Sequence, residues 1–259
     1  MRVLFIGDVV GRPGRRALQE ALPGIKSELA LDFIIANGEN AAGGNGLTRP
    51  VADELYAAGV DVITMGNHVW DKKEIFDFID REEKLLRPAN YPDPCPGRGY
   101  GIFEVGGVRV GVVNLSGRVF VGGGLLCPFR VIDRILEEIR PITPLIIVDF
   151  HAEATSEKIA LSWYLDGRVS ALIGTHTHVQ TADEKILPGG TAYITDAGMT
   201  GPWVSVLGVK PATVIEKFLL QRPVKFEVAS GPYQFNAVLL DLDEETGRCR
   251  EIRRINYYE

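Results

Sequence analysis

The sequence is poor in cysteine. Its 259 residues include only three, Cys95, Cys127 and Cys249, and these lie far apart. An odd number at this spacing forms neither a disulfide framework nor the paired-cysteine knuckle of a structural zinc site. Reduced thiols are the simpler interpretation, so the composition favours a cytoplasmic protein whose chemistry does not depend on sulfur.

Long hydrophobic runs are also absent. No apolar run approaches the ~20 residues that a membrane-spanning helix needs. The first run, Val3 to Ile6, is followed by Asp8 before a leader-length segment develops. We therefore expect no membrane partner and no secretion signal.

Positive charge is in short supply, since 28 lysines and arginines stand against 34 aspartates and glutamates, a formal net charge of −6. Proteins bind duplex nucleic acid largely through basic side chains that displace counterions from phosphates. We therefore expect no duplex nucleic acid as partner. A small anionic substrate would need local positive charge, which bound metal ions could supply.

The composition is otherwise that of a globular protein, with 46% hydrophobic and 24% charged residues. Short β-rich runs alternate with helical patterns, which indicates βαβ units. The predicted strands are 3–6, 33–36, 62–65, 102–105, 108–110, 145–148 and 171–173, with antiparallel strands between 225 and 240; the predicted helices are 15–29, interrupted near Pro23, and one capped near Thr48. We expect one α/β domain over residues 1–259, with a mixed sheet or a pair of sheets between helices.

Histidine is rare as well, and its placement is informative. The chain has four histidines, and each follows a predicted strand, as do several acidic and amide residues. These candidates are Asp8, Glu39, Asn40, Asn67, His68, His151, His176 and His178. Ligands of open α/β sheets bind at the carboxyl ends of strands, so these groups should meet at one edge. On an extended segment His176 and His178 would face the same side.

Each of these groups alone is weak, because a Gly-Asp after a strand is usually a turn and a lone buried histidine is usually a hydrogen-bonded core residue. Together they predict a metal centre of carboxylate, amide and imidazole ligands. Such a donor set suits iron or manganese, and zinc is compatible with it.

Three longer motifs carry a family resemblance: Gly7-Asp8-Val9-Val10-Gly11-Arg12-Pro13-Gly14, Asn37-Gly38-Glu39-Asn40-Ala41 and Gly66-Asn67-His68-Val69-Trp70-Asp71. With His151 and Gly174-Thr175-His176-Thr177-His178, they resemble the calcineurin-like metallophosphoesterases, and more closely their YmdB-like branch, over essentially the whole chain. The resemblance implies a sandwich of two mixed β-sheets flanked by helices (αββα). The chain departs from the broad superfamily at Val10, where Asp-x-His is usual, and at Glu39, where an aspartate usually bridges. In the YmdB-like branch Asn40 replaces the missing histidine.

The resemblance also implies a ligand set. One ion would be held by Asp8, Glu39, Asn40 and His178, and a second by Glu39, Asn67, His151 and His176. The implied activity is hydrolysis of small phosphodiesters, 2′,3′- or 3′,5′-cyclic nucleotides, through a hydroxide shared by two transition-metal ions. His68 is left over, and by resemblance it protonates the leaving oxygen.

Some residues carry weaker expectations. Asp71 could orient His68 or could simply be a carboxylate at a helix N-terminus. Residues 43–46 form a glycine-rich loop that needs positive φ and could form a lip, and 117–124 could form a rim. Arg12 and Arg15 could meet a phosphate, although solvated arginines are commoner, and packing is the simpler role for Trp203.

Alternative functions remain open at this point. Gly7, Gly11 and Gly14 could belong to a dinucleotide-binding loop, but their spacing departs from G-x-G-x-x-G and Asp8 would face the pyrophosphate. A regulatory metal- or nucleotide-binding protein with little turnover and a phosphomonoesterase are the other candidates. A tail of strands could also pair across a two-fold axis in a homo-oligomer.

Overall fold

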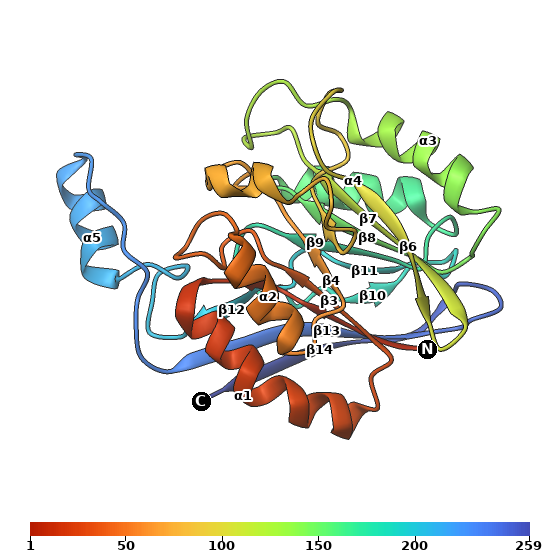
Figure 1. The fold of residues 1–259 in the computed structure, drawn as a ribbon, viewed down its shortest axis with the longest axis horizontal. Coiled ribbons are helices and arrows are strands. Elements are labelled where there is room, and N and C mark those ends of the chain that lie inside the picture. The colour runs from red at the N-terminus through yellow and green to blue at the C-terminus, as the bar shows by residue number, and fades with distance from the viewer.

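A computed structural model describes residues 1–259 and contains two mixed β-sheets between layers of helices (Figure 1). The first sheet has the order β2-β12-β13-β1-β3-β4-β5, and β14 pairs with β13. Its strands are β1 Arg2–Ile6, β2 Asp8–Val9, β3 Phe33–Asn37, β4 Val62–Thr64, β5 Leu85–Leu86, β12 Met199–Pro202, β13 Tyr233–Leu242 and β14 Cys249–Tyr258. Strands β1, β3, β4 and β5 run parallel, whereas β13 is antiparallel to β1, β12 and β14.

The second sheet has the order β10-β11-β9-β8-β7-β6. Its strands are β6 Tyr100–Val105, β7 Val108–Ser116, β8 Ile146–His151, β9 Ala171–Thr175, β10 Lys185–Ile186 and β11 Ala192–Ile194. The helices are α1 Gly11–Leu29, α2 Arg49–Ala57, α3 Pro128–Ile139, α4 Thr155–Leu165 and α5 Pro211–Leu220, with a 3₁₀ turn η1 Lys73–Asp77. The αββα fold expected from the resemblance is confirmed.

The alternation of side chains along each strand explains the layers. In β1, Val3 and Phe5 belong to the core between the two sheets, while Leu4 and Ile6 belong to the core beneath α1 and α2. A third core packs α3 and α4 against the second sheet, and Val148 of β8 belongs to it. Because successive residues point to opposite faces, strands covered on both faces are apolar throughout.

Two predicted elements, the first helix and the tail, were wrong in part. Helix α1 begins at Gly11 and continues through Pro23 without interruption. The side of the helix at Pro23 is exposed, so the carbonyl that loses its helical partner can bond water. The tail forms β13 only from Tyr233, and β14 was not predicted. The hairpin of β6 and β7 around Gly106 is confirmed.

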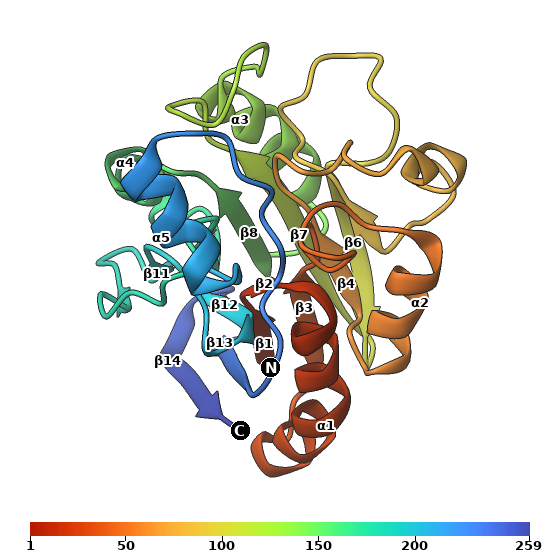
Figure 2. The ribbon, with the colours of Figure 1, turned by 90° about the vertical axis from the view of Figure 1, so that its left-hand side faces the viewer.

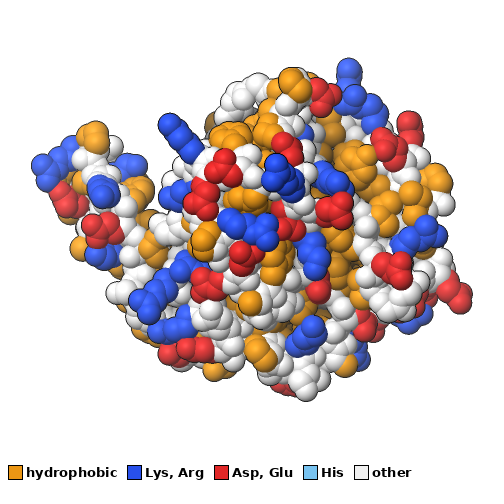
Figure 3. Space-filling model, viewed as in Figure 1, with side chains coloured by type: hydrophobic (Ala, Val, Ile, Leu, Met, Phe, Trp, Pro, Cys, Tyr) orange, Lys and Arg blue, Asp and Glu red, His pale blue; other side chains and the backbone are white.

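Helix α5 differs from the other helices because it projects from the body (Figures 1 and 2). Figure 2 shows the chain returning from α5 past β2 before it enters β13. None of the helices has both the length and the apolar character needed to cross a membrane. On the face drawn in Figure 3, acidic and basic side chains are interspersed.

Candidate metal centre

Polar side chains at the ends of strands from both sheets form one cluster. Asp8 opens β2, and Glu39 follows β3 after a turn in which Asn37 Oδ1 accepts a hydrogen bond from the Glu39 N–H at 3.2 Å. From the second sheet, His151 is the last residue of β8 and His176 follows β9. The structure brings together all eight of the residues singled out from the sequence.

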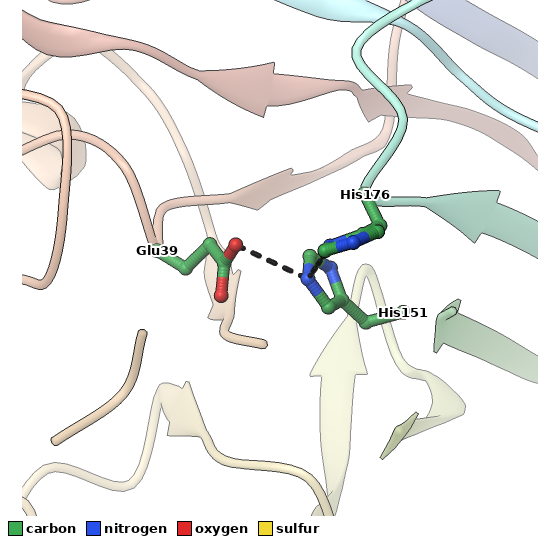
Figure 4. A group of neighbouring side chains, drawn as sticks. All are labelled: Glu39, His151 and His176. Carbon is green, nitrogen blue, oxygen red and sulfur yellow. Dashed lines mark hydrogen bonds and ion pairs between the residues drawn. The ribbon is translucent and has the colours of Figure 1, made fainter. Parts of the chain in front are cut away.

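The most compact part of the cluster surrounds His151 Nε2 (Figure 4). Three atoms lie close to this nitrogen: Glu39 Oε1 at 3.1 Å, Asn67 Oδ1 at 3.0 Å and His176 Nδ1 at 2.9 Å. Donor atoms of Glu39, His151 and His176 all lie within 4.8 Å of one another. A hydrogen on Nε2 can be donated to only one of these three atoms, whereas a cation among the four atoms would be bound by all of them. The residues present therefore fit a metal ion.

A second group of donors shares Glu39. The Asn40 side chain lies 3.2 Å from Glu39 Oε1, 3.2 Å from His178 Nε2 and 3.5 Å from Asp8 Oδ1, each distance measured from Nδ2. His178 Nε2 is 3.8 Å from Asp8 Oδ1. An amide nitrogen suits these acceptors when no cation is bound, and a half-turn about χ2 would present Oδ1 to a cation instead. This second group also fits a metal ion.

The charges in the cluster depend on each other. Burial opposes charge on Glu39, but His151 outweighs it and lowers the pKa of Glu39 to about 2. Burial also opposes charge on His151, but the carboxylates of Glu39 and Asp8 raise the pKa of His151 to about 9. Burial and the charge on His151 lower the pKa of His176 to about 4, and burial raises the pKa of Asp8. A proton on His151 thus supplies the positive charge that the buried carboxylates require.

A chain of hydrogen bonds fixes the ring of His151. Thr175 Oγ1 donates to Asp149 Oδ1 at 2.7 Å, so it accepts from His151 Nδ1 at 3.0 Å. With Nδ1 carrying a hydrogen, the lone pair of Nε2 can be directed into the cluster. Asp149 is fully buried, and Thr64 and Asn37 also donate to it. Burial raises the pKa of Asp149 to about 6. Asp149 was not predicted, although a carboxylate inside the apolar run of β8 was a signal.

The loop that carries His176 and His178 is not extended, so the alternation expected for these residues was wrong. His176 has φ of 106° and His178 has φ of 64°, a region that non-glycine residues rarely adopt. The backbone N–H of His176 donates to Asp8 Oδ2 at 3.1 Å, and that of Thr177 donates to Asp196 Oδ2 at 3.0 Å. Strained backbone of this kind persists where the surrounding contacts hold it, often at functional sites.

His68 lies at the edge of the cluster and points elsewhere. Its backbone N–H donates to Glu39 Oε2 at 2.9 Å, but its ring Nδ1 contacts Asp71 Oδ2 at 2.8 Å. Asn45 Nδ2 also donates to Asp71 Oδ2. The structure therefore favours Asp71 as the residue that orients His68. The ring of His68 is 38% exposed and lines a cavity of about 440 Å³.

The structure confirms some of the weaker expectations from the sequence and not others. Arg15 pairs with Glu54 and donates to the carbonyl of Ala41, a structural role, and Arg12 is exposed on α1. Glycines 43, 44 and 46 have positive φ, as expected, and 43–45 line the cavity. Residues 117–124 do not line it. Trp203 packs edge-on against Tyr258.

The glycines near Asp8 serve close backbone packing. A Cβ on Gly7 would collide with the carbonyl oxygen of Gly198, and one on Gly14 with that of Thr200. Both places are thus filled by the chain around β12, which leaves no room there for a pyrophosphate. The dinucleotide-binding alternative is excluded.

Fold and centre together define a class, the α/β sandwiches with a carboxylate–imidazole centre at the strand ends. A putative 5′-nucleotidase from Staphylococcus aureus shares this fold with a TM-score of 0.64, at 16% identity, and this chain covers 54% of that structure and 98% of its own length. The chain belongs to the YmdB-like family, because the model of YmdB-like proteins matches residues 4–255. The family expected from the motifs is confirmed.

Relatives within the family are similar over almost their entire lengths. A Bacillus subtilis (strain 168) protein named 2′,3′-cyclic-nucleotide 2′-phosphodiesterase is 52% identical over 98% of this chain and 96% of its own length. The crystal structure of a protein from Thermus thermophilus matches with a TM-score of 0.94 and 47% identity over the whole of both chains. A Mycoplasma pneumoniae structure described as a novel phosphatase has a TM-score of 0.94 at 36% identity, covering all of this chain and 93% of that one.

Proposed function

We propose that this chain is a metal-dependent phosphodiesterase that hydrolyses 2′,3′-cyclic nucleotides. The observation that carries the proposal is the position of Glu39, whose carboxylate lies between two groups of donor atoms, one with His151 and one with Asn40. The name and 52% identity of the Bacillus subtilis relative support the substrate class.

Two ions would share Glu39. Asp8, Asn40 and His178 would complete one site, and Asn67, His151 and His176 the other; iron or manganese suits these ligands best, and zinc is compatible with them. Bound ions would supply Lewis acidity toward the phosphate and an activated water.

The other residues have separate tasks. Hydrolysis adds water across the bond between phosphorus and O2′, so the O2′ leaving group must gain a proton. His68 lines the cavity without contacting the donor groups through its ring, and Asp71 orients it, so His68 is the proposed donor of that proton. The product would be a nucleoside 3′-phosphate.

The test is a comparison of metal-free and reconstituted protein on a 2′,3′-cyclic nucleotide, with the products separated by chromatography. We expect turnover only after reconstitution, with nucleoside 3′-phosphate as the accumulating product. Glu39→Ala should lose both ions and all activity, whereas Glu54→Gln, which removes a carboxylate at the Arg15 ion pair, should lose neither. A protein that leaves the cyclic nucleotide intact but releases inorganic phosphate from a nucleoside 3′-phosphate would be a phosphomonoesterase, and metal or nucleotide binding without turnover of either compound would indicate a regulatory protein.

A further inference from the structure

The cavity beside the metal centre has two different walls. One wall is polar and carries Glu39, Asn40, His68, His176 and His178. The other is apolar and is formed by the segments on either side of α5; its residues are Leu207, Val209, Phe226 and Val228. Because the proposed chemistry takes place at the polar wall, the apolar wall must contact some other part of the ligand.

The apolar wall is built from paired backbone. Val209 and Val228 form an antiparallel bridge, and the flanking bonds run from Lys210 N–H to the Glu227 carbonyl at 3.0 Å and from Ala229 N–H to the Gly208 carbonyl at 2.9 Å. Two separate stretches of chain, one before α5 and one after it, are thus joined into a single wall.

The wall is also fixed against the body of the protein. A Cβ on Gly44 would lie 2.6 Å from Val228 Cγ2, so Val228 packs directly on the glycine-rich loop. His178 Nδ1 donates to the Leu207 carbonyl at 3.0 Å, which ties the wall to the metal centre. Residues 226–228 line the cavity, and the segment pairs with the stretch before α5 instead of joining either sheet.

Other polar side chains on the cavity are already paired. Asn45 Nδ2 donates to Asp71, and Asn45 Oδ1 accepts from Lys72. Glu227 forms an ion pair with Lys210. Away from the donor groups, therefore, the cavity offers apolar contact, with few side-chain groups free to read a hydrogen-bonding edge.

Phe226 is the largest apolar side chain on this wall. Its side chain is 46% exposed, although a phenyl ring gains by burial. The ammonium group of Lys217 lies 4.6 Å from the ring centroid and covers one face of the ring, and Phe226 also lines the cavity. An aromatic ring held in this way is the usual platform for a nucleobase.

We propose that Phe226, with Leu207 and Val228, forms a stacking subsite for the nucleobase of the substrate, and that this subsite does not select a particular base. The inference rests on the proposed phosphodiesterase function, and it adds the part of the substrate that lies outside the metal centre. A cavity of about 440 Å³ lies in the range that encloses small ligands.

The experiment compares two substrates of the metal-loaded protein: 2′,3′-cyclic AMP, and the 2′,3′-cyclic phosphate of methyl β-D-ribofuranoside, which has no base. Stacking that is equal in ground and transition states affects KM and leaves kcat unchanged. We expect Phe226→Ala to raise KM for cyclic AMP roughly 5- to 150-fold, the worth of one base stacked on an aromatic side chain. Both constants for the base-free compound should stay unchanged. Phe226→Trp should restore the low KM.

A matched control is Phe218→Ala, since Phe218 is an exposed phenylalanine on α5 that does not line the cavity. It should change neither substrate's constants. Equal changes on both substrates in Phe226→Ala would make Phe226 a structural residue and overturn the subsite, as would an unchanged KM for cyclic AMP. If the unmodified protein hydrolyses neither compound, the proposed function fails and the subsite fails with it.

The proposal that the subsite does not select a particular base has its own test. Cyclic phosphates of adenosine, guanosine, cytidine and uridine should differ in kcat/KM by no more than about tenfold, with purines ahead because they stack over a larger area. A preference above about 10³-fold for one base would contradict the subsite as proposed, because apolar contact alone discriminates by only about 10–200-fold and a larger preference requires hydrogen bonds to a base edge.

Discussion

His68 differs from the other three histidines in what its ring contacts. The rings of His151, His176 and His178 each contact another donor group of the cluster, whether carboxylate, imidazole or amide, whereas the ring of His68 faces Asp71 and the cavity. His68→Ala should therefore keep nearly normal metal content while kcat falls by roughly 10²–10⁴, the usual contribution of a positioned acid. Elemental analysis and steady-state kinetics on the same preparations check this.

The role of His68 can also be tested by changing the leaving group of the substrate. A nitrophenolate leaves without protonation, but the O2′ of ribose does not, so the loss in His68→Ala should be small for a nitrophenyl phosphodiester and large for a cyclic nucleotide. His151→Ala is the control, and it should lose metal and activity on both substrates. Equal losses in His68→Ala would mean that His68 positions the phosphate, and loss of metal would make it a ligand.

Individual residues were predictable from the sequence where they followed a strand. Asp8, Asn67 and His151 were found in this way, because the ends of strands converge whatever the details of packing. Asp149 and Lys158 were not found, because each lies inside a strand or helix and its function depends on a partner distant in sequence. The carboxylate inside the apolar run of β8 marks Asp149 as unusual, but no local pattern specifies which residues it contacts.

At the scale of elements, one buried ion pair holds the loop of His176 and His178. Lys158 on α4 donates to Asp196 Oδ2 at 2.9 Å, both side chains are fully buried, and Asp196 also accepts the N–H of Thr177. Removing one member of such a pair leaves an uncompensated charge. Lys158→Met should therefore lower the free energy of unfolding by about 3–5 kcal/mol, measured by chemical denaturation.

The same change should also affect the centre. With Asp196 unpaired, the strained backbone at His176 loses part of its support, so Lys158→Met should bind metal more weakly even under conditions where the protein is fully folded. Lys26→Met, at an exposed position on α1, is the matched control and should alter neither quantity. Unchanged metal affinity in folded Lys158→Met would show that the pair contributes to stability alone.

The length of a strand limits whether it can be predicted. The strands β1, β3, β8 and β9 were expected because each is a run of apolar residues long enough to be recognised as a strand. The strands β2, β5 and β10 have two residues each, too short for any periodicity, and they exist only because a longer neighbour pairs with them. Helix α5, which lies between the two segments of the apolar wall, was not predicted either.

For the whole molecule, residues 1–259 as a single domain stay a prediction, and so do a homo-oligomer and the absence of a duplex nucleic acid partner. The core between the sheets includes Phe5 of β1 and Ile147 of β8, so neither sheet can unfold alone without exposing it. Thermal unfolding should accordingly show one transition, with coincident midpoints by circular dichroism and tryptophan fluorescence. Two separated midpoints would divide the chain into two domains.

Metal binding should shift that transition, because the centre joins the two sheets. Glu39 follows β3 of the first sheet and His151 ends β8 of the second, so an ion held by both opposes separation of the layers. A ligand at 100 times its Kd that binds only the folded protein adds about 2.7 kcal/mol of stability. For a chain of this size, each kcal/mol raises Tm by roughly 2–4 °C, so saturating Mn²⁺ should raise Tm by roughly 5–11 °C over the chelator-treated protein. Glu39→Ala should abolish the shift and Glu54→Gln should keep it; an equal shift in all three proteins would mean that the ion binds elsewhere.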